Sequence, residues 1–149
     1  MLSFTVMRYL KSILVFSLVL VVNFSCSKGG SGTDDPANHI NNPNDIIPPV
    51  ITVNSPVPDQ VFNSGNTINI SGRITDDLGL YRGTIRIIND ANGAVVKEQQ
   101  YEIHGLPAYD FNVNHVAVVS TASDYTVSVW FEDHGYNSVT KTVKIKVNP

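Results

Sequence analysis

Several residue types are scarce in this sequence of 149 residues. It has one cysteine, one tryptophan and two methionines, and only 15% of its residues are charged. A single cysteine cannot form an internal disulfide, so packing and backbone pairing must hold any folded domain together. Ten basic residues against 13 acidic ones give a net charge of −3, and no run of lysine or arginine occurs. This balance excludes the basic surface that most nucleic-acid-binding proteins need, and we expect no nucleic-acid partner.

The sequence also lacks the motifs of common catalytic sites. It contains no HExxH zinc motif, no glycine-rich phosphate loop, no serine in a nucleophile-elbow pattern and no base beside its cysteine. The acidic pair Asp76 and Asp77 lies in one loop, and a domain this small has little room for a deep cleft. None of the histidines has metal-ligand spacing: His39, His104, His115 and His134. We therefore predict that the protein is not an enzyme.

What the sequence does contain begins with a targeting segment. Two basic residues precede an apolar run of ten residues from Ile13 to Val22. As a helix this run measures about 15 Å, against the roughly 30 Å of hydrocarbon that a spanning helix must cross. The pattern predicts a signal peptide over residues 1–25 and no transmembrane anchor.

The residues around the lone cysteine, Cys26, resemble the lipobox of bacterial lipoproteins. In that family the cysteine carries a lipid and becomes the first residue of the mature chain, and the small Ser25 before it fits the pattern. The resemblance implies attachment to the outer membrane of a Gram-negative cell, on either its periplasmic or its cell-surface face. The alternative is an ordinary signal peptide that releases a secreted protein. An unpaired thiol is prone to oxidation outside the cytoplasm, which favours lipidation.

A flexible tether follows, over residues 26–47. Glycine, serine, asparagine, aspartate and proline dominate it, and such chains cannot bury enough apolar surface to offset their ordering entropy. Cleavage before Cys26 leaves eight basic residues against 13 acidic ones, a net charge of −5. We therefore expect the chain to associate with the membrane through its lipid and not through a general electric field.

The remaining residues, 48–149, predict one all-β domain. Residues 67–75 alternate strictly between apolar and polar side chains, which is typical of a half-buried strand, and the same period of two returns in residues 125–132 and 139–147. About seven strands at roughly ten-residue spacing predict an immunoglobulin-like antiparallel β-sandwich. Less regular strands are expected at residues 50–54, 84–89, 95–101 and 109–118, with turns at residues 76–79, 90–93, 104–107 and 133–137.

Two segments, TINISGRITDDLGL and DYTVSVWFEDHGYNSVTKTVKIKV, resemble the second, sixth and seventh strands of bacterial immunoglobulin-like domains of extracellular proteins. In that family an aspartate closes the second strand, a tyrosine corner opens the sixth, and an acidic residue, a glycine and an asparagine end it. The matching residues here are Asp76, Tyr125, Asp133, Gly135 and Asn137. The resemblance implies an extracytoplasmic module with a structural or protein-interaction role.

A first candidate site follows from the expected topology. In an immunoglobulin-like sandwich the loops after the second and sixth strands and the start of the first strand meet at one end. Asp76, Asp77, Asp133 and Asn137 would converge there, with Asp45 as a further contributor. Carboxylate, amide and carbonyl oxygens are the ligands that calcium prefers, so this end is a candidate calcium site. The alternative is that these residues only form turns, since Asp and Asn hydrogen-bond their own backbone.

A second candidate site surrounds the only tryptophan, Trp130. Alternation places it on the outer face of its strand, with Lys144 expected on the neighbouring strand and Arg86 on the other side. An exposed aromatic on a flat sheet can stack against a sugar ring, which indicates an accessory glycan-binding lipoprotein, calcium-dependent, as the alternative function. The competing interpretation is that a loop covers Trp130, or that it accepts a cation contact worth about 0.5–1 kcal/mol.

Overall fold

The computed structural model describes residues 41–149 of the chain. The predicted signal peptide, Cys26 and the first part of the predicted tether lie outside the described residues. The described part contains eight strands and no helix, and therefore no helix that could cross a membrane.

All seven strands expected from the sequence are present. Their bounds are β1 (Val50–Ser55), β3 (Thr67–Thr75), β4 (Leu80–Asn89), β5 (Val95–Glu102), β6 (Ala108–Val116), β7 (Ser123–Asp133) and β8 (Ser138–Asn148). Strand β4 begins four residues earlier than predicted, at Leu80, and its pairing with β7 is irregular between Leu80 and Arg82. This irregularity interrupts the period of two, so the alternation in the sequence begins only at Thr84.

One strand was not predicted. Strand β2 (Gln60–Asn63) has only four residues, too few to show a period, and it pairs with β8 in parallel. This is the one parallel pairing among the described strands of an otherwise antiparallel sandwich. After β1 the chain crosses to the other sheet and runs beside β8 in the same direction, which places β2 at a sheet edge.

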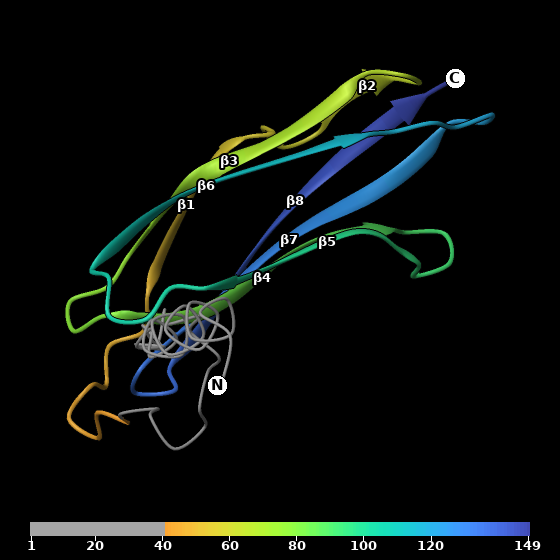
Figure 1. The fold of residues 1–149 in the computed structure, drawn as a ribbon. Helices are drawn as coiled ribbons and strands as arrows, with labels where there is room; N and C mark the ends of the chain where they lie inside the picture. Colours follow the sequence, from red (N-terminus) through yellow and green to blue (C-terminus); the bar gives the residue numbers. More distant parts are fainter. Residues whose placement is uncertain (1–40) are drawn as a thin grey trace, which may run out of the picture. The chain divides into compact units, whose positions relative to one another are not determined.

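The strands form two packed sheets, as Figure 1 shows. One sheet has the order β1-β3-β6 and the other has the order β2-β8-β7-β4-β5. The remaining strand pairs are antiparallel. Strand β1 pairs with β3 and β3 with β6 in the first sheet, and β4 pairs with β7 in the second, so the chain passes back and forth between the sheets. This arrangement is that of an immunoglobulin-like sandwich, so the predicted fold class is confirmed.

The core lies between the sheets. The apolar face of β3 is fully buried at Ile68, Ile70 and Ile74, as its alternation predicted. Phe131 of β7 is also fully buried, with its ring 6.2 Å from that of Phe111 on the opposite sheet. Gly83 of β4 faces Phe131 so closely that a Cβ atom added there would lie 2.1 Å from the ring. The glycine therefore provides the space that the phenylalanine fills.

Residues 41–49, named here the N-terminal arm, pack against the sandwich before β1 begins. The backbone N–H of Asn42 donates to the carbonyl of His134 at 3.0 Å, and the side-chain amide of Asn137 donates to the carbonyl of Asp45 at 2.9 Å. Among the described residues, contacts with the domain thus include Asn42, six residues before the expected domain start at residue 48.

Candidate functional site

Four aspartates gather at one end of the sandwich, named here the acidic pole: Asp45, Asp76, Asp77 and Asp133. They come from the N-terminal arm, the β3–β4 turn and the end of β7, and Figure 1 shows these segments at the end opposite the C-terminus. One oxygen each from Asp45, Asp76 and Asp77 lies within 4.8 Å of the others. The convergence of Asp76 and Asp77 with the arm is as the topology predicted.

Asp76 forms the β3–β4 turn and still has a free acceptor. Its Oδ1 atom accepts hydrogen bonds from the N–H groups of Leu78 at 3.1 Å and Gly79 at 2.7 Å. Its Oδ2 atom is buried and has no hydrogen-bond partner among the described residues. Burial raises the pKa of the Asp76 carboxyl, and the two backbone amides act in the opposite direction. The turn therefore uses one oxygen and leaves the other facing the pole.

Asp45 is the most deeply placed carboxylate of the three. Only 3% of the residue is exposed, and neither carboxylate oxygen has a hydrogen-bond partner among the described residues. Burial raises the pKa of the Asp45 carboxyl, and the charges of Asp133 and Asp76 raise it further. The nearby N–H of Ile47 partly offsets this rise without reaching hydrogen-bonding geometry.

Asp133 and Asn137 differ from the other predicted ligands because they satisfy each other. Asp133 is fully buried; its Oδ1 accepts the N–H of Asn137 at 2.8 Å and its Oδ2 accepts the Asn137 side-chain amide at 2.9 Å. The same amide holds the Asp45 carbonyl. Gly135, in the turn between them, lies where a Cβ atom would be 2.3 Å from that carbonyl. Asp133, Gly135 and Asn137 thus form the surface against which the N-terminal arm packs, and Asp45 faces the β3–β4 turn.

The burial of Asp45 could not be predicted from the sequence. The residue lies in a polar, proline-rich stretch with the composition of a tether, so only the fold shows that it is buried. The one sequence feature that indicates packing here is the apolar pair Ile46 and Ile47, which interrupts the polar composition directly after Asp45. Both isoleucines are exposed, at 79% and 56%, so even this signal does not identify the residue that packs.

A ring cluster adjoins the acidic pole. The ring of Tyr81 lies 5.0 Å from that of His104 and 5.2 Å from that of His134, and Arg82 lies 5.0 Å from its face. The two histidine rings are 5.8 Å apart, although 30 residues separate them in sequence. In the described part of the chain, the three aspartates remain the one group with metal-ligand spacing.

Trp130 lies where alternation placed it, on the outer face of β7. It is partly buried, and its register partners are Thr84 on β4 and Thr140 on β8. Arg86 pairs with Glu98 at 2.6 Å, and Lys144 pairs with Asp90 at 2.6 Å. Trp130, Arg86 and Lys144 thus lie on one sheet face, as predicted, but each of the two cations forms an ion pair with a carboxylate.

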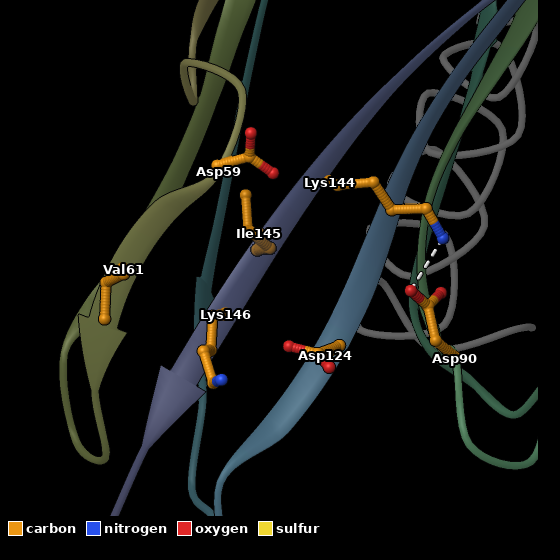
Figure 2. A pocket seen from close by; sticks show the side chains of 7 residues that line it. All are labelled: Asp59, Val61, Asp90, Asp124, Lys144, Ile145 and Lys146. Atoms are coloured by element: carbon orange, nitrogen blue, oxygen red, sulfur yellow. Dashed lines mark hydrogen bonds and ion pairs between the residues drawn. The ribbon is translucent and has the colours of Figure 1, made fainter.

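A pocket of about 380 Å³ lies at the end of the sandwich away from the acidic pole. Figure 2 shows its side chains, which come from the loop before β2, from β2 itself, from the β4–β5 turn, and from β7 and β8: Asp59, Val61, Asp90, Asp124, Lys144, Ile145 and Lys146. Asp124 and Lys146 are register partners, and Lys144 is paired with Asp90. Its charged side chains are of both signs, three aspartates and two lysines, and polar, solvent-accessible side chains of this kind also form the rim of protein interfaces.

The Asp90 to Lys144 pair makes a pH-dependent contribution to stability. The hydrogen bonds from Lys144 and Thr126 lower the pKa of the Asp90 carboxyl below its ordinary 3.8. A lowered pKa in the folded state gives stability that is present above pH 3.8 and lost as the pH falls through the lowered value. In urea unfolding, Asp90→Asn should cost less than about 1 kcal/mol at pH 7, because the pair is exposed, and less than that at a pH below the lowered pKa. An equal cost at both pH values would contradict this assignment.

Fold and register define the described domain as an immunoglobulin-like β-sandwich. Similar solved structures include the fibronectin(III)-like modules of Clostridium thermocellum CbhA, with a TM-score of 0.42 and 14% identity, covering 66% of this chain and 94% of that chain. They also include a CARDB domain from Pyrococcus furiosus solved in complex with di-metal ions, with a TM-score of 0.39 and 16% identity, covering 68% of this chain and 96% of that chain. At such identities the likeness concerns the fold alone. No protein-family model and no curated protein matches the chain.

Proposed function

We propose that the chain is a lipid-anchored, extracytoplasmic module with a structural or protein-interaction role and no catalytic activity. The immunoglobulin-like fold fits such a module. The observation that carries the proposal is the placement of the two ends. The N-terminal arm joins the sandwich at the acidic pole, whereas the charged pocket around Lys144 and Asp124 lies at the other end. An anchor that precedes the arm would hold the pole toward the membrane and present the pocket to a partner.

The anchor that we propose is a lipid on Cys26 in the outer membrane of a Gram-negative cell. The support is in the sequence, where the cysteine directly follows a signal-peptide pattern. A lipid chain supplies about 0.8 kcal/mol for each buried CH₂ group, and two or more chains give stable attachment without any spanning segment.

The test is membrane fractionation of the full chain and Cys26→Ser, both expressed in a Gram-negative host with labelled palmitate. We expect the wild-type chain to carry label and sediment with the outer membrane, and Cys26→Ser to be unlabelled and soluble. Ser27→Ala changes the residue on the other side of the cysteine and should behave as wild type. A Cys26→Ser chain that sediments like the wild type would contradict lipid anchoring. Protease treatment of intact cells then determines which face displays the domain.

A second candidate function is accessory glycan binding by the outer face of β7, with calcium as its cofactor. The observation that favours it is the partly exposed Trp130 ring, which lies between two short threonine side chains, Thr84 and Thr140, on the outer face of the sheet. Because the neighbouring side chains are short, the apolar face of a sugar can reach the planar ring.

Retention of the full chain on immobilised polysaccharides, in calcium and in chelator, tests this candidate. Trp130→Ala should abolish retention, and removal of calcium should weaken it. Tyr136→Ala removes an exposed aromatic from the β7–β8 turn instead and should leave retention unchanged. Equal retention of wild type and Trp130→Ala would remove glycan binding at this face from consideration.

A further inference from the structure

We propose that the acidic pole binds a calcium ion through Asp45, Asp76 and Asp77, and that this ion fixes the N-terminal arm to the sandwich. The juxtaposition is specific: one carboxylate comes from the arm and two come from the β3–β4 turn, with oxygens within 4.8 Å of one another. Only the folded chain brings them together, since about 30 residues separate Asp45 from Asp76.

Exposed acidic residues often cluster without a metal, but Asp45 differs from such residues because its carboxylate is buried and has no hydrogen-bond partner in the described part of the chain. The residue is 97% buried, faces the other two carboxylates, and has no hydrogen-bond partner at either oxygen among the described residues. Asp76 adds a buried oxygen in the same condition. No described lysine, arginine or histidine forms an ion pair with any aspartate of the pole. Burying a carboxylate without compensation is costly unless it takes up a proton or binds a cation, and three carboxylates that converge from two segments favour a shared cation.

The donor set selects the kind of cation. The cluster offers carboxylate oxygens, which are hard ligands suited to calcium and magnesium and not to thiolate- or imidazole-binding metals. Calcium binds oxygens at roughly 2.3–2.6 Å, so two of its ligands can lie up to about 5 Å apart, and the 4.8 Å span fits within this limit. Asp77 is exposed, so one side of the cluster opens to solvent and leaves room for the water ligands of an irregular calcium shell.

The consequence is a calcium-dependent joint. Asp133 and Asn137 hold the carbonyl side of Asp45, whereas its carboxylate faces two like charges. Without the ion these charges oppose the docking of the arm, and with it they become ligands that bind the arm to the β3–β4 turn. The binding of the ion does not depend on the proposed lipid anchor. The stiffening of a membrane-proximal joint does rest on that anchor.

The test is thermal unfolding of the full chain in non-ionic detergent, in millimolar calcium and in chelator. Calcium at about 100 times its dissociation constant should raise the midpoint by roughly 10–20 °C for a domain of this size. In Asp45→Asn the calcium response should disappear, and the midpoint in chelator should equal or exceed that of the wild type, because a buried charge has been removed. In Asp77→Asn, where the changed residue is exposed, the same response should need at least tenfold more calcium.

Asp124→Asn is the matched control, since it makes the same charge change at the other end of β7 and should keep the full response. Superimposable wild-type curves in calcium and chelator would overturn the proposal, as would an unchanged response in Asp45→Asn or in Asp77→Asn. Loss of the response in Asp124→Asn would overturn it in favour of a general effect of net charge. An equal shift with magnesium would overturn the assignment to calcium. A protein that binds calcium while Cys26→Ser still sediments with membranes separates this proposal from the anchor.

Discussion

Replacing Phe131 with alanine should lower the free energy of unfolding by about 3–5 kcal/mol. The ring is fully buried and lies between the sheets, within 5.8 Å of the Tyr101 ring and 6.2 Å of the Phe111 ring. The cavity cannot collapse easily, because the facing position is Gly83, which has no side chain to move into it. This loss is a large part of the roughly 5–15 kcal/mol that stabilises a typical domain.

Urea unfolding of the full chain, followed by the fluorescence of its single tryptophan, measures this effect. Val118→Ala is the control, since Val118 is 80% exposed and its truncation should change stability by no more than about 0.5 kcal/mol. A cost below about 1 kcal/mol for Phe131→Ala would mean that the two sheets do not pack around this ring.

Replacing Gly135 with alanine should detach the N-terminal arm without unfolding the sandwich. An added Cβ atom would lie 2.3 Å from the Asp45 carbonyl oxygen and 2.8 Å from the Asn137 amide nitrogen, so the arm must move. Gly135 does not have positive φ, so its backbone accepts alanine and the effect is confined to the contact. Because Asp45 then leaves the β3–β4 turn, calcium affinity should fall at least tenfold.

Amide hydrogen exchange of the full chain reports the arm directly. The Asn42 and Asp45 N–H groups, which donate to His134 and Asn42, should exchange faster in Gly135→Ala, while N–H groups in β3 and β7 keep their protection. Ser138→Ala, at an exposed position in the same turn region, should exchange as wild type. Unchanged exchange at Asp45 in Gly135→Ala would show that the arm does not pack on this turn.

The sequence predicts the fold well where one face of a strand is buried. Ile68, Ile70 and Ile74 on β3 alternate with polar residues because one side faces the core, so period and burial agree. Strand β2 has four residues and lies at a sheet edge, so neither length nor period distinguishes it from a loop. The start of β4 was missed for a related reason, because its pairing irregularity disrupts the alternation.

The candidate site could be predicted only in part. The topology rule placed Asp76, Asp77 and Asp133 at one end, because loops that follow alternate strands meet there. It could not show that both Asp133 oxygens accept hydrogen bonds from Asn137, nor that Asp45 is buried with no such bond. The Asp133 and Asn137 bonds lie within one turn, four residues apart, as the turn-forming alternative expected. The burial of Asp45 depends on contacts with segments more than 30 residues away, which no local pattern encodes.

A crystal structure of the full chain grown in calcium tests the central claim most directly. We expect one calcium ion at the acidic pole, with oxygens of Asp45, Asp76 and Asp77 at roughly 2.3–2.6 Å from it and with the N-terminal arm packed against the sandwich. A pole without calcium density, with Asp45 turned to solvent or hydrogen-bonded as a neutral acid, would contradict this claim.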